Sequence, residues 1–211
     1  MPHPEPSPLP RFAILGSGRG SNAVALMAEF RRGALPAELA VVVANVKGAA
    51  ILEHASRAGY ATALIESAGR SRLAHEELCL MCLREHHVEH LLLAGYMRIL
   101  SPEFIAGWPG VILNIHPALL PDFRGRDAVA QQWQAGVRVA GATVHFVDAG
   151  VDTGPPLLCG SIAVRGDEGE AGLAERIRSE VEHVIYPRAV RLLLERLARG
   201  GPLHGQDRSS P

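Results

Sequence analysis

The sequence is short of lysine, of cysteine and of long apolar runs. Lys47 is the only lysine in 211 residues, and the formal net charge at pH 7 is −1. This balance gives no electrostatic reason to expect binding to nucleic acid or to an anionic membrane surface. No apolar run approaches the roughly 20 residues that cross a bilayer. Residues 1–10 lack the basic start and apolar centre of a signal peptide, so we expect a cytoplasmic protein.

Cysteine and histidine give no pattern of a disulfide framework or a metal centre. The three cysteines are an odd number in a chain of this size. Cys79 and Cys82 have the C-x-x-C spacing of metal and redox sites, but they lie in an apolar helical run that favours core packing. We expect His86, His87 and His90 to be exposed residues that connect this helix to the next strand. The sequence therefore predicts no metal site.

Short apolar runs alternate with longer amphipathic ones through most of the chain. The predicted strands are residues 12–15, 39–44, 62–65, 88–94 and 111–115, and the predicted helices are residues 22–32, 49–58, 72–85, 102–107 and 128–136. Because these strands are apolar on both faces, they predict a parallel sheet covered by helices. Right-handed crossovers bring the carboxyl ends of such strands to one edge, where ligands of open α/β sheets bind.

The pattern changes in the last third of the chain. Residues 142–147 and 156–164 resemble strands separated by too few residues for a helix, which predicts a mixed or antiparallel extension. Residues 173–197 have helical spacing, which we expect Pro187 to kink or restart. The expected fold is a single α/β domain over residues 11–199. Its open twisted sheet is mostly parallel, Rossmann-like in the N-terminal half, with helices on both faces. Residues 1–10 and 200–211 are expected to be disordered.

A glycine-rich loop follows the first predicted strand, with Gly16, Gly18 and Gly20 within five residues. Glycines allow close approach of the backbone, and the N-terminus of the next helix offers free N–H groups, so the loop predicts an anion site. It lacks the third glycine of a dinucleotide fingerprint, because Ser21 stands there, and it lacks the lysine of a triphosphate loop. A phosphate monoester fits best, and a tight turn with Ser21 as helix N-cap is the structural alternative.

Asn114 and His116 stand at the end of the strand predicted for residues 111–115. Residues two apart in a strand share a face, so a carboxamide and an imidazole point to one place, where they could hold a carbonyl group and move a proton. If the loop that carries Asp152 folds against His116, its carboxylate favours the protonated imidazole that a general acid requires. A capped strand-end histidine among ordinary turn residues is the alternative.

Five segments together resemble the phosphoribosylglycinamide formyltransferases, the folate-dependent enzymes of purine biosynthesis. They are residues 18–22 (GRGSN), 94–102 (AGYMRILSP), 114–121 (NIHPALLP), 144–147 (VHFV) with 152–155 (DTGP), and 182–187 (EHVIYP), in family order within residues 11–198. The resemblance implies Asn114, His116 and Asp152 as catalytic residues. The implied folate-binding residues are Arg72, Met97, Arg98, Ile99, Leu100, Asn114, Asp148, Ala149, Gly150, Val151 and Asp152, and the implied ribonucleotide-binding residues are Gly20, Ser21, Asn22 and Glu182.

The resemblance implies transfer of a formyl group from 10-formyltetrahydrofolate to the primary amine of glycinamide ribonucleotide. It implies no metal, no nucleic-acid or membrane partner, and a monomer or homodimer. Three departures from the family pattern matter: one residue is inserted between Arg176 and Glu182, Arg124 stands where proline is frequent, and Thr143 stands where some members have serine. The alternatives are a tRNA formyltransferase, a formyl-folate hydrolase, a formyltransferase for a nucleotide-linked sugar amine, and a folate- or nucleotide-binding module without catalysis.

Overall fold

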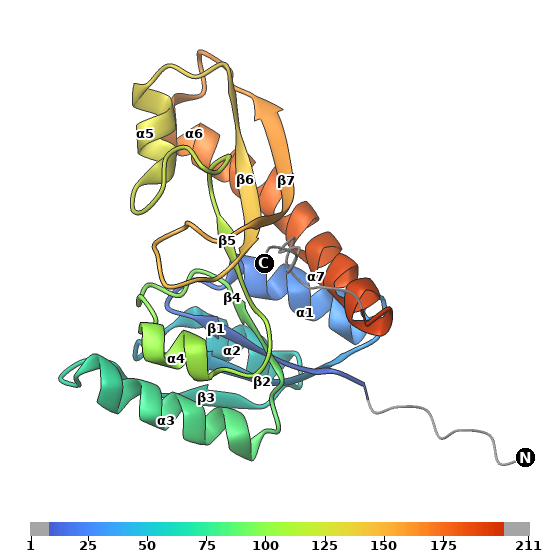
Figure 1. Ribbon diagram of the computed structural model, residues 1–211. Helices are drawn as coiled ribbons and strands as arrows, with labels where there is room; N and C mark the ends of the chain where they lie inside the picture. Colours follow the sequence, from blue (N-terminus) through green and yellow to red (C-terminus); the bar gives the residue numbers. More distant parts are fainter. Residues whose placement is uncertain (1–8, 201–211) are drawn as a thin grey trace, which may run out of the picture.

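The computed structural model describes residues 9–200, which form a seven-stranded sheet with helices on both faces (Figure 1). The strands are β1 (Arg11–Gly16), β2 (Glu38–Ala44), β3 (Thr62–Leu64), β4 (His90–Leu93), β5 (Ile112–His116), β6 (Val139–Phe146) and β7 (Pro156–Ala163). The helices are α1 (Ser21–Arg31), α2 (Ala50–Arg57), α3 (Arg72–Glu85), α4 (Pro102–Gly107), α5 (Ala128–Gln134), α6 (Gly169–Arg176), the π-helix η1 (Ile177–Glu182) and α7 (His183–Ala198). The expected disordered ends, residues 1–10 and 200–211, lie almost wholly outside the described residues.

The strand order is β3-β2-β1-β4-β5-β6-β7. The first five strands are parallel, and β6 and β7 add antiparallel pairs to β5. This confirms the predicted fold class, a mostly parallel open sheet with an antiparallel extension. Leu15 pairs with Leu93, and Leu93 pairs with Asn114, so β1 and β4 end at the level of Asn114. The strand order reverses between β1 and β4, and the ends of these strands form the ligand-binding edge of such sheets.

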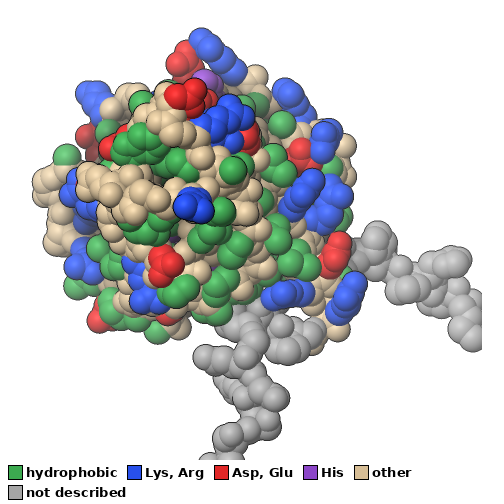
Figure 2. Space-filling view, turned by 90° about the horizontal axis from the view of Figure 1, so that it is seen from above, with side chains coloured by type: hydrophobic (Ala, Val, Ile, Leu, Met, Phe, Trp, Pro, Cys, Tyr) green, Lys and Arg blue, Asp and Glu red, His purple; other side chains and the backbone are tan. Residues whose placement is uncertain are grey.

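Alternating side chains of β1 build two apolar layers, one on each face of the sheet. Phe12 and Ile14 face the cluster that contains residues of α1, α2 and α7, whereas Ala13 and Leu15 face residues of α3 and α4. All four side chains are at most 1% exposed, as expected for a central parallel strand. On the face seen in Figure 2, basic and acidic side chains are interspersed, in keeping with the near-zero net charge. None of the helices in residues 9–200 is long and apolar enough to cross a membrane.

Pro187 was expected to kink or restart the helix, and the restart lies four residues before it, at His183. The helix runs through Pro187, and the irregular segment is the π-helix η1 that ends at Glu182. The hydrogen-bond pattern changes from i→i+5 to i→i+4 at this junction. A backbone N–H at position 187 would donate to the carbonyl of Glu182 in the first pattern and to that of His183 in the second. Proline has no N–H, so the missing hydrogen bond falls at a point where the helical pattern is already interrupted.

The prediction that His90 is an exposed connector is wrong. His90 is the first residue of β4, it is buried, and its Nδ1 accepts a hydrogen bond from the N–H of Val111 (3.1 Å). His87 is exposed and His86 is half-buried. Within residues 9–200, no three histidine, cysteine, aspartate or glutamate side chains come together as a metal site.

Candidate active site

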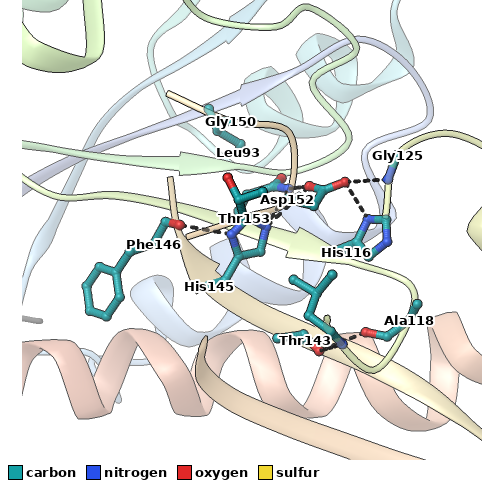
Figure 3. Close-up of polar contacts among 12 residues, drawn as sticks. Leu93, His116, Ala118, Gly125, Thr143, His145, Phe146, Gly150, Asp152 and Thr153 are labelled. Atoms are coloured by element: carbon teal, nitrogen blue, oxygen red, sulfur yellow. Dashed lines mark hydrogen bonds and ion pairs between the residues drawn. The ribbon is translucent and has the colours of Figure 1, made fainter. Parts of the chain in front are cut away.

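Asn114 and His116 end the last parallel strand, and the structure brings the carboxylate of Asp152 to both. Figure 3 shows this carboxylate beside His116. Oδ2 of Asp152 lies 3.2 Å from Nδ1 of His116, and Oδ1 lies 3.5 Å from Nδ2 of Asn114. The side chains of His116 and Asp152 are only 6% and 13% exposed. The three residues that the sequence singled out for catalysis therefore share one small buried volume, and their catalytic role stays a prediction.

The backbone fixes the carboxylate of Asp152. Its φ of 52° lies in the left-handed region, and the N–H of Gly125 donates a hydrogen bond of 2.9 Å to Oδ2. Burial raises the pKa of Asp152, but hydrogen bonds from His145 and Gly125 and the positive charge of His116 outweigh it, so the pKa lies below its ordinary value. Asp152 is therefore a carboxylate at neutral pH.

Both ring nitrogens of His116 face hydrogen-bond acceptors. Nδ1 faces Asp152, and Nε2 lies 2.8 Å from the carbonyl oxygen of Phe123. Only the imidazolium, with a proton on each nitrogen, donates to both acceptors at once. Phe123 itself has a left-handed φ of 52°, within the turn that carries Arg124. Both sides of the His116 ring are thus set by fixed oxygen atoms of the surrounding turn and loop.

Sequence reasoning assigned no role to His145, which the structure places beside Asp152. His145 is 2% exposed and pairs with Asn114 across β5 and β6. Its Nδ1 lies 2.9 Å from the carbonyl of Phe146 and carries a proton. Its Nε2 lies 3.2 Å from Nδ2 of Asn114 and 3.4 Å from Oδ1 of Asp152, so it accepts from the amide when neutral and donates to the carboxylate when protonated. The antiparallel register that creates this contact has no signal in the sequence.

The glycine-rich loop lies against α2, and its shape leaves the N-terminus of α1 open. Gly20 is the N-cap residue with a φ of 76°, and a Cβ there would lie 2.7 Å from Cβ of Ile51. Ser21 is the first residue of the helix and makes no capping hydrogen bond, so the N-cap alternative for this residue is wrong. The free N–H groups of the first turn and the positive end of the helix dipole remain available to an anion.

A hydrogen bond between Asn22 of α1 and Glu182 of η1 connects these two helices beside the glycine loop. Nδ2 of Asn22 donates a hydrogen bond of 2.9 Å to Oε2 of Glu182, and Oδ1 of Asn22 is buried without a partner in the described part of the chain. Burial raises the pKa of Glu182, opposed by the hydrogen bond from Asn22 and by the charge of Arg178. The insertion expected between Arg176 and Glu182 would fall within the π-helix η1, where one added residue is accommodated, and the hydrogen bond to Asn22 brings Glu182 to the loop.

The residues that the resemblance assigns to folate differ in their surroundings. Met97 and Ile99 are 76% and 59% exposed, and Val151 is 45% exposed, which is unusual for large apolar side chains. Leu100 is buried, and Arg98 donates to the carbonyl of Ser67 (3.3 Å).

The remaining assigned residues lie in the loop of residues 148–152 and at the start of α3. Asp148 is a turn former, because its carboxylate accepts from the N–H of Gly150 (3.1 Å) and the hydroxyl of Thr153 (2.6 Å). Ala149 and Gly150 are exposed. Arg72 begins α3, is exposed, and makes no hydrogen bond or ion pair with the rest of residues 9–200, so the structure does not join it to the other predicted site residues.

The chain matches the family described as formyl transferase over residues 10–190. It is 37% identical to the phosphoribosylglycinamide formyltransferase of Bacillus subtilis (strain 168) over 191 residues, which cover 90% of this chain and 97% of that protein. It is 39% identical to the trifunctional purine biosynthetic protein adenosine-3 of Homo sapiens over 87% of this chain, and it spans 18% of that protein's length. The crystal structure of glycinamide ribonucleotide transformylase 1 from Symbiobacterium toebii matches with a TM-score of 0.87 and 39% identity, covering 92% of both chains.

Proposed function

Since the chain belongs to the formyl transferase family, among its phosphoribosylglycinamide formyltransferases, we propose that Asn114, His116 and Asp152 carry out its formyl transfer. The formyl group moves from 10-formyltetrahydrofolate to the primary amine of glycinamide ribonucleotide, giving N-formylglycinamide ribonucleotide and tetrahydrofolate in purine biosynthesis. The observation that carries this assignment of roles is the buried Asp152 carboxylate, 3.2 Å from the His116 imidazole and 3.5 Å from the Asn114 amide.

The ribonucleotide would lie between the glycine loop and Glu182. The first-turn N–H groups at Gly20, Ser21 and Asn22 suit its phosphate, because they point at an anion without the cost of desolvating a full positive charge. Glu182 keeps one carboxylate oxygen on Asn22 (2.9 Å), which leaves the other to accept from a ribose hydroxyl. This arrangement directs the amine of the substrate toward the ends of β4 and β5.

The formyl donor would lie against the exposed apolar side chains of Met97, Ile99 and Val151, whose burial by a pterin ring would be favourable. Its formyl oxygen gains negative charge when the amine attacks. The amide of Asn114 and a ring N–H of His116 are the donors placed to stabilise that charge, and one such donor can be worth about 3 kcal/mol of barrier. His116 reaches this oxygen once Nε2 exchanges the Phe123 carbonyl for it.

The amine proton needs an acceptor. An amine with a pKa near ~8 is free in only about a tenth of molecules at pH 7. The carbon–nitrogen bond that forms makes the attacking nitrogen cationic and more acidic. Asp152, directly or through a water, takes this proton and passes it to the folate nitrogen as the bond between that nitrogen and the formyl carbon breaks. The lowered pKa of Asp152 keeps this carboxylate ionised at neutral pH, so it is free to accept a proton.

An assay of the purified protein with 10-formyltetrahydrofolate tests the proposal. Transfer to glycinamide ribonucleotide should greatly exceed release of formate to water, and formate release alone would make the protein a hydrolase. The variant His116→Ala should lose roughly 10²- to 10³-fold in turnover, as for removal of an oxyanion donor, with little change in substrate binding. The control His87→Asn changes an exposed histidine whose positive φ asparagine tolerates. Equal turnover of the two variants would remove His116 from the mechanism.

A further inference from the structure

A chain of hydrogen bonds crosses the carboxyl edge of the sheet through the segments that follow its first four strands. Ser67 follows β3 and Asn45 follows β2. Ser17 follows β1 and Met97 follows β4, so the four residues have the same order as their strands in the sheet. Ser17 belongs to the glycine loop, three residues before Gly20, and Met97 begins the run of residues assigned to folate. The hydrogen bonds therefore connect the loop proposed for one substrate with the segment proposed for the other.

The half-buried Ser17 lies at the centre of this network. Its Oγ donates a hydrogen bond to Oδ1 of Asn45 (2.6 Å) and accepts one from the backbone N–H of Met97 (2.8 Å). The backbone N–H of Ser17 donates to the carbonyl of Gly95 (3.0 Å). A serine hydroxyl has a single proton, and because Asn45 accepts it, the lone pairs of the oxygen are left for Met97. One residue of the glycine loop thus holds the segment after β4 at two points.

Asn45 fixes the direction of the Ser17 hydroxyl. It is only 5% exposed, and its Nδ2 donates to Oγ of Ser67 (3.0 Å). The backbone carbonyl of Asn45 accepts from the N–H of Ser67 (3.0 Å), and the carbonyl of Ser67 accepts from the guanidinium of Arg98 (3.3 Å). Both ends of the Asn45 amide are therefore used within the network. A polar network whose buried groups are paired in this way is rigid.

Met97 differs in its backbone and its side chain. The N–H is held by Ser17, whereas the residue as a whole is 76% exposed. Its thioether side chain therefore presents an apolar surface whose position is set by the backbone. Because that backbone is bonded to Ser17, a displacement of the glycine loop also displaces the surface at Met97.

We propose that Ser17 and Asn45 are positioning residues that make the binding of the acceptor and of the formyl donor cooperative. The inference rests on the proposed function, in which the acceptor phosphate occupies the glycine loop and the donor lies against Met97. Each ligand restricts the motion of the segment that it contacts, and the network extends this restriction to the other segment. The second ligand then meets an ordered site and loses less conformational entropy on binding.

Calorimetry with glycinamide ribonucleotide and tetrahydrofolate measures this coupling, because the pair has no formyl group to transfer. In the wild type, each ligand should raise the affinity for the other at least about fivefold, the lower end of the range for coupled sites. Ser17→Ala removes the hydroxyl that joins the two segments. It should abolish most of this coupling, with the affinity for each ligand alone nearly unchanged.

Two further comparisons control for stability. Tyr60→Phe removes another half-buried hydroxyl, which donates to the carbonyl of Met27 in α1 (3.1 Å) outside the network, and it should keep the wild-type coupling. Asn45→Asp keeps an oxygen that accepts from Ser17, whereas Asn45→Ala does not. The aspartate variant should therefore retain more of the coupling than the alanine variant, a comparison that decides the matter if Ser17→Ala does not fold.

Hydrogen exchange gives a readout of the ordering itself. The ribonucleotide alone should slow exchange of the Met97 N–H in the wild type and in Tyr60→Phe, and slow it less in Asn45→Ala. Equal slowing in Asn45→Ala and the wild type, or no slowing in the wild type, would count against the network as the connection.

A merely structural role for Ser17 predicts a different result. Ser17→Ala would then weaken the binding of each ligand alone and leave their coupling at the value of Tyr60→Phe. That outcome, or a wild type that binds the two ligands independently, would overturn the inference. If such a wild type still transfers the formyl group to the ribonucleotide, the proposed function stands. Coupling that is lost in Ser17→Ala supports the inference even if no formyl group is transferred, and a wild type that binds neither ligand would overturn both.

Discussion

The parallel and antiparallel halves of the sheet supply the site in different ways. In the parallel half, β1, β4 and β5 reach one level, where they present the glycine loop, residues 97–100 and the pair Asn114 and His116. In the antiparallel half, β6 reaches the same level near its carboxyl end and delivers His145, and the loop after it returns Asp152 to the sheet. In the parallel half, the ends of the strands position the site residues. In the antiparallel half, the pairing register of the strands positions them.

This difference decides what each half can tolerate. A loop at the end of a parallel strand keeps its place through a change of one residue in length, because its position is set by the strand. A side chain within an antiparallel pair depends on register, and a shift of one residue turns it to the other face. We expect changes at His116 of β5 or at Asp152 to reduce turnover, and changes at the glycine loop of the parallel half to weaken substrate binding.

The largest expected effect is in the antiparallel half. Asp152→Asn keeps the size of the side chain but removes the negative charge that faces His116 and His145. Turnover should fall by roughly 10²- to 10⁴-fold, the range for loss of a general acid–base group. Steady-state kinetics should show this fall in kcat with KM for the ribonucleotide changed little. A kcat within a few-fold of the wild type would show that the carboxylate is not needed for proton transfer.

A smaller effect is expected from the glycine loop of the parallel half. Gly20→Ala combines a left-handed φ of 76° with a Cβ 2.7 Å from that of Ile51. The φ penalty alone is about 1–2 kcal/mol, and the collision displaces the loop as well. We expect a lower Tm and a raised KM for the ribonucleotide.

Gly33→Ala is the matched control for Gly20→Ala. Gly33 has a φ of 70°, and an added Cβ would meet nothing within 4 Å, so this variant has the φ penalty without the collision. Its Tm should fall less and its KM should not change. If the two variants lost the same Tm and the same KM, the loop would not depend on its contact with α2.

The smallest effect is expected where the C-terminal helix α7 joins the parallel half. The hydroxyl of the fully buried Tyr186 lies 3.0 Å from the carbonyl of Leu93 and 3.2 Å from that of Leu113. Tyr186→Phe leaves these carbonyls without the hydroxyl donor and should cost about 1–3 kcal/mol in urea unfolding. The half-buried Tyr60, whose hydroxyl donates to Met27, is the control. Tyr60→Phe should cost less, because water can replace its hydroxyl, and an equal cost would mean that burial does not matter here.

The sequence predicted the parallel half well because each strand there is a short apolar run between amphipathic helices. It also placed Asn114 and His116 together, because residues two apart share one face of a strand in parallel and antiparallel sheets alike. It could not give His145 a role, because the partner of this residue depends on the register of β6 against β5. The position of the break before α7 was missed for a related reason. Proline is visible in the sequence, whereas the π turn at Ile177–Glu182 is a change in hydrogen-bond pattern that no residue type marks.

The hydrogen bond between Nε2 of His116 and the Phe123 carbonyl couples two equilibria. The Nε2–H of His116 cannot donate a full hydrogen bond to this carbonyl and to a formyl oxygen at once. Binding of the formyl donor therefore competes with the hydrogen bond that holds the turn at Phe123. The competing bond is worth about 1.5–3 kcal/mol for a charged donor. The two equilibria are opening of the turn and binding of the donor, and each favours the other by the same factor. A change that opens the turn therefore strengthens donor binding. If His116 binds the formyl oxygen as proposed, the affinity for the formyl donor is set partly by the Phe123 carbonyl, a peptide group outside the proposed folate contacts.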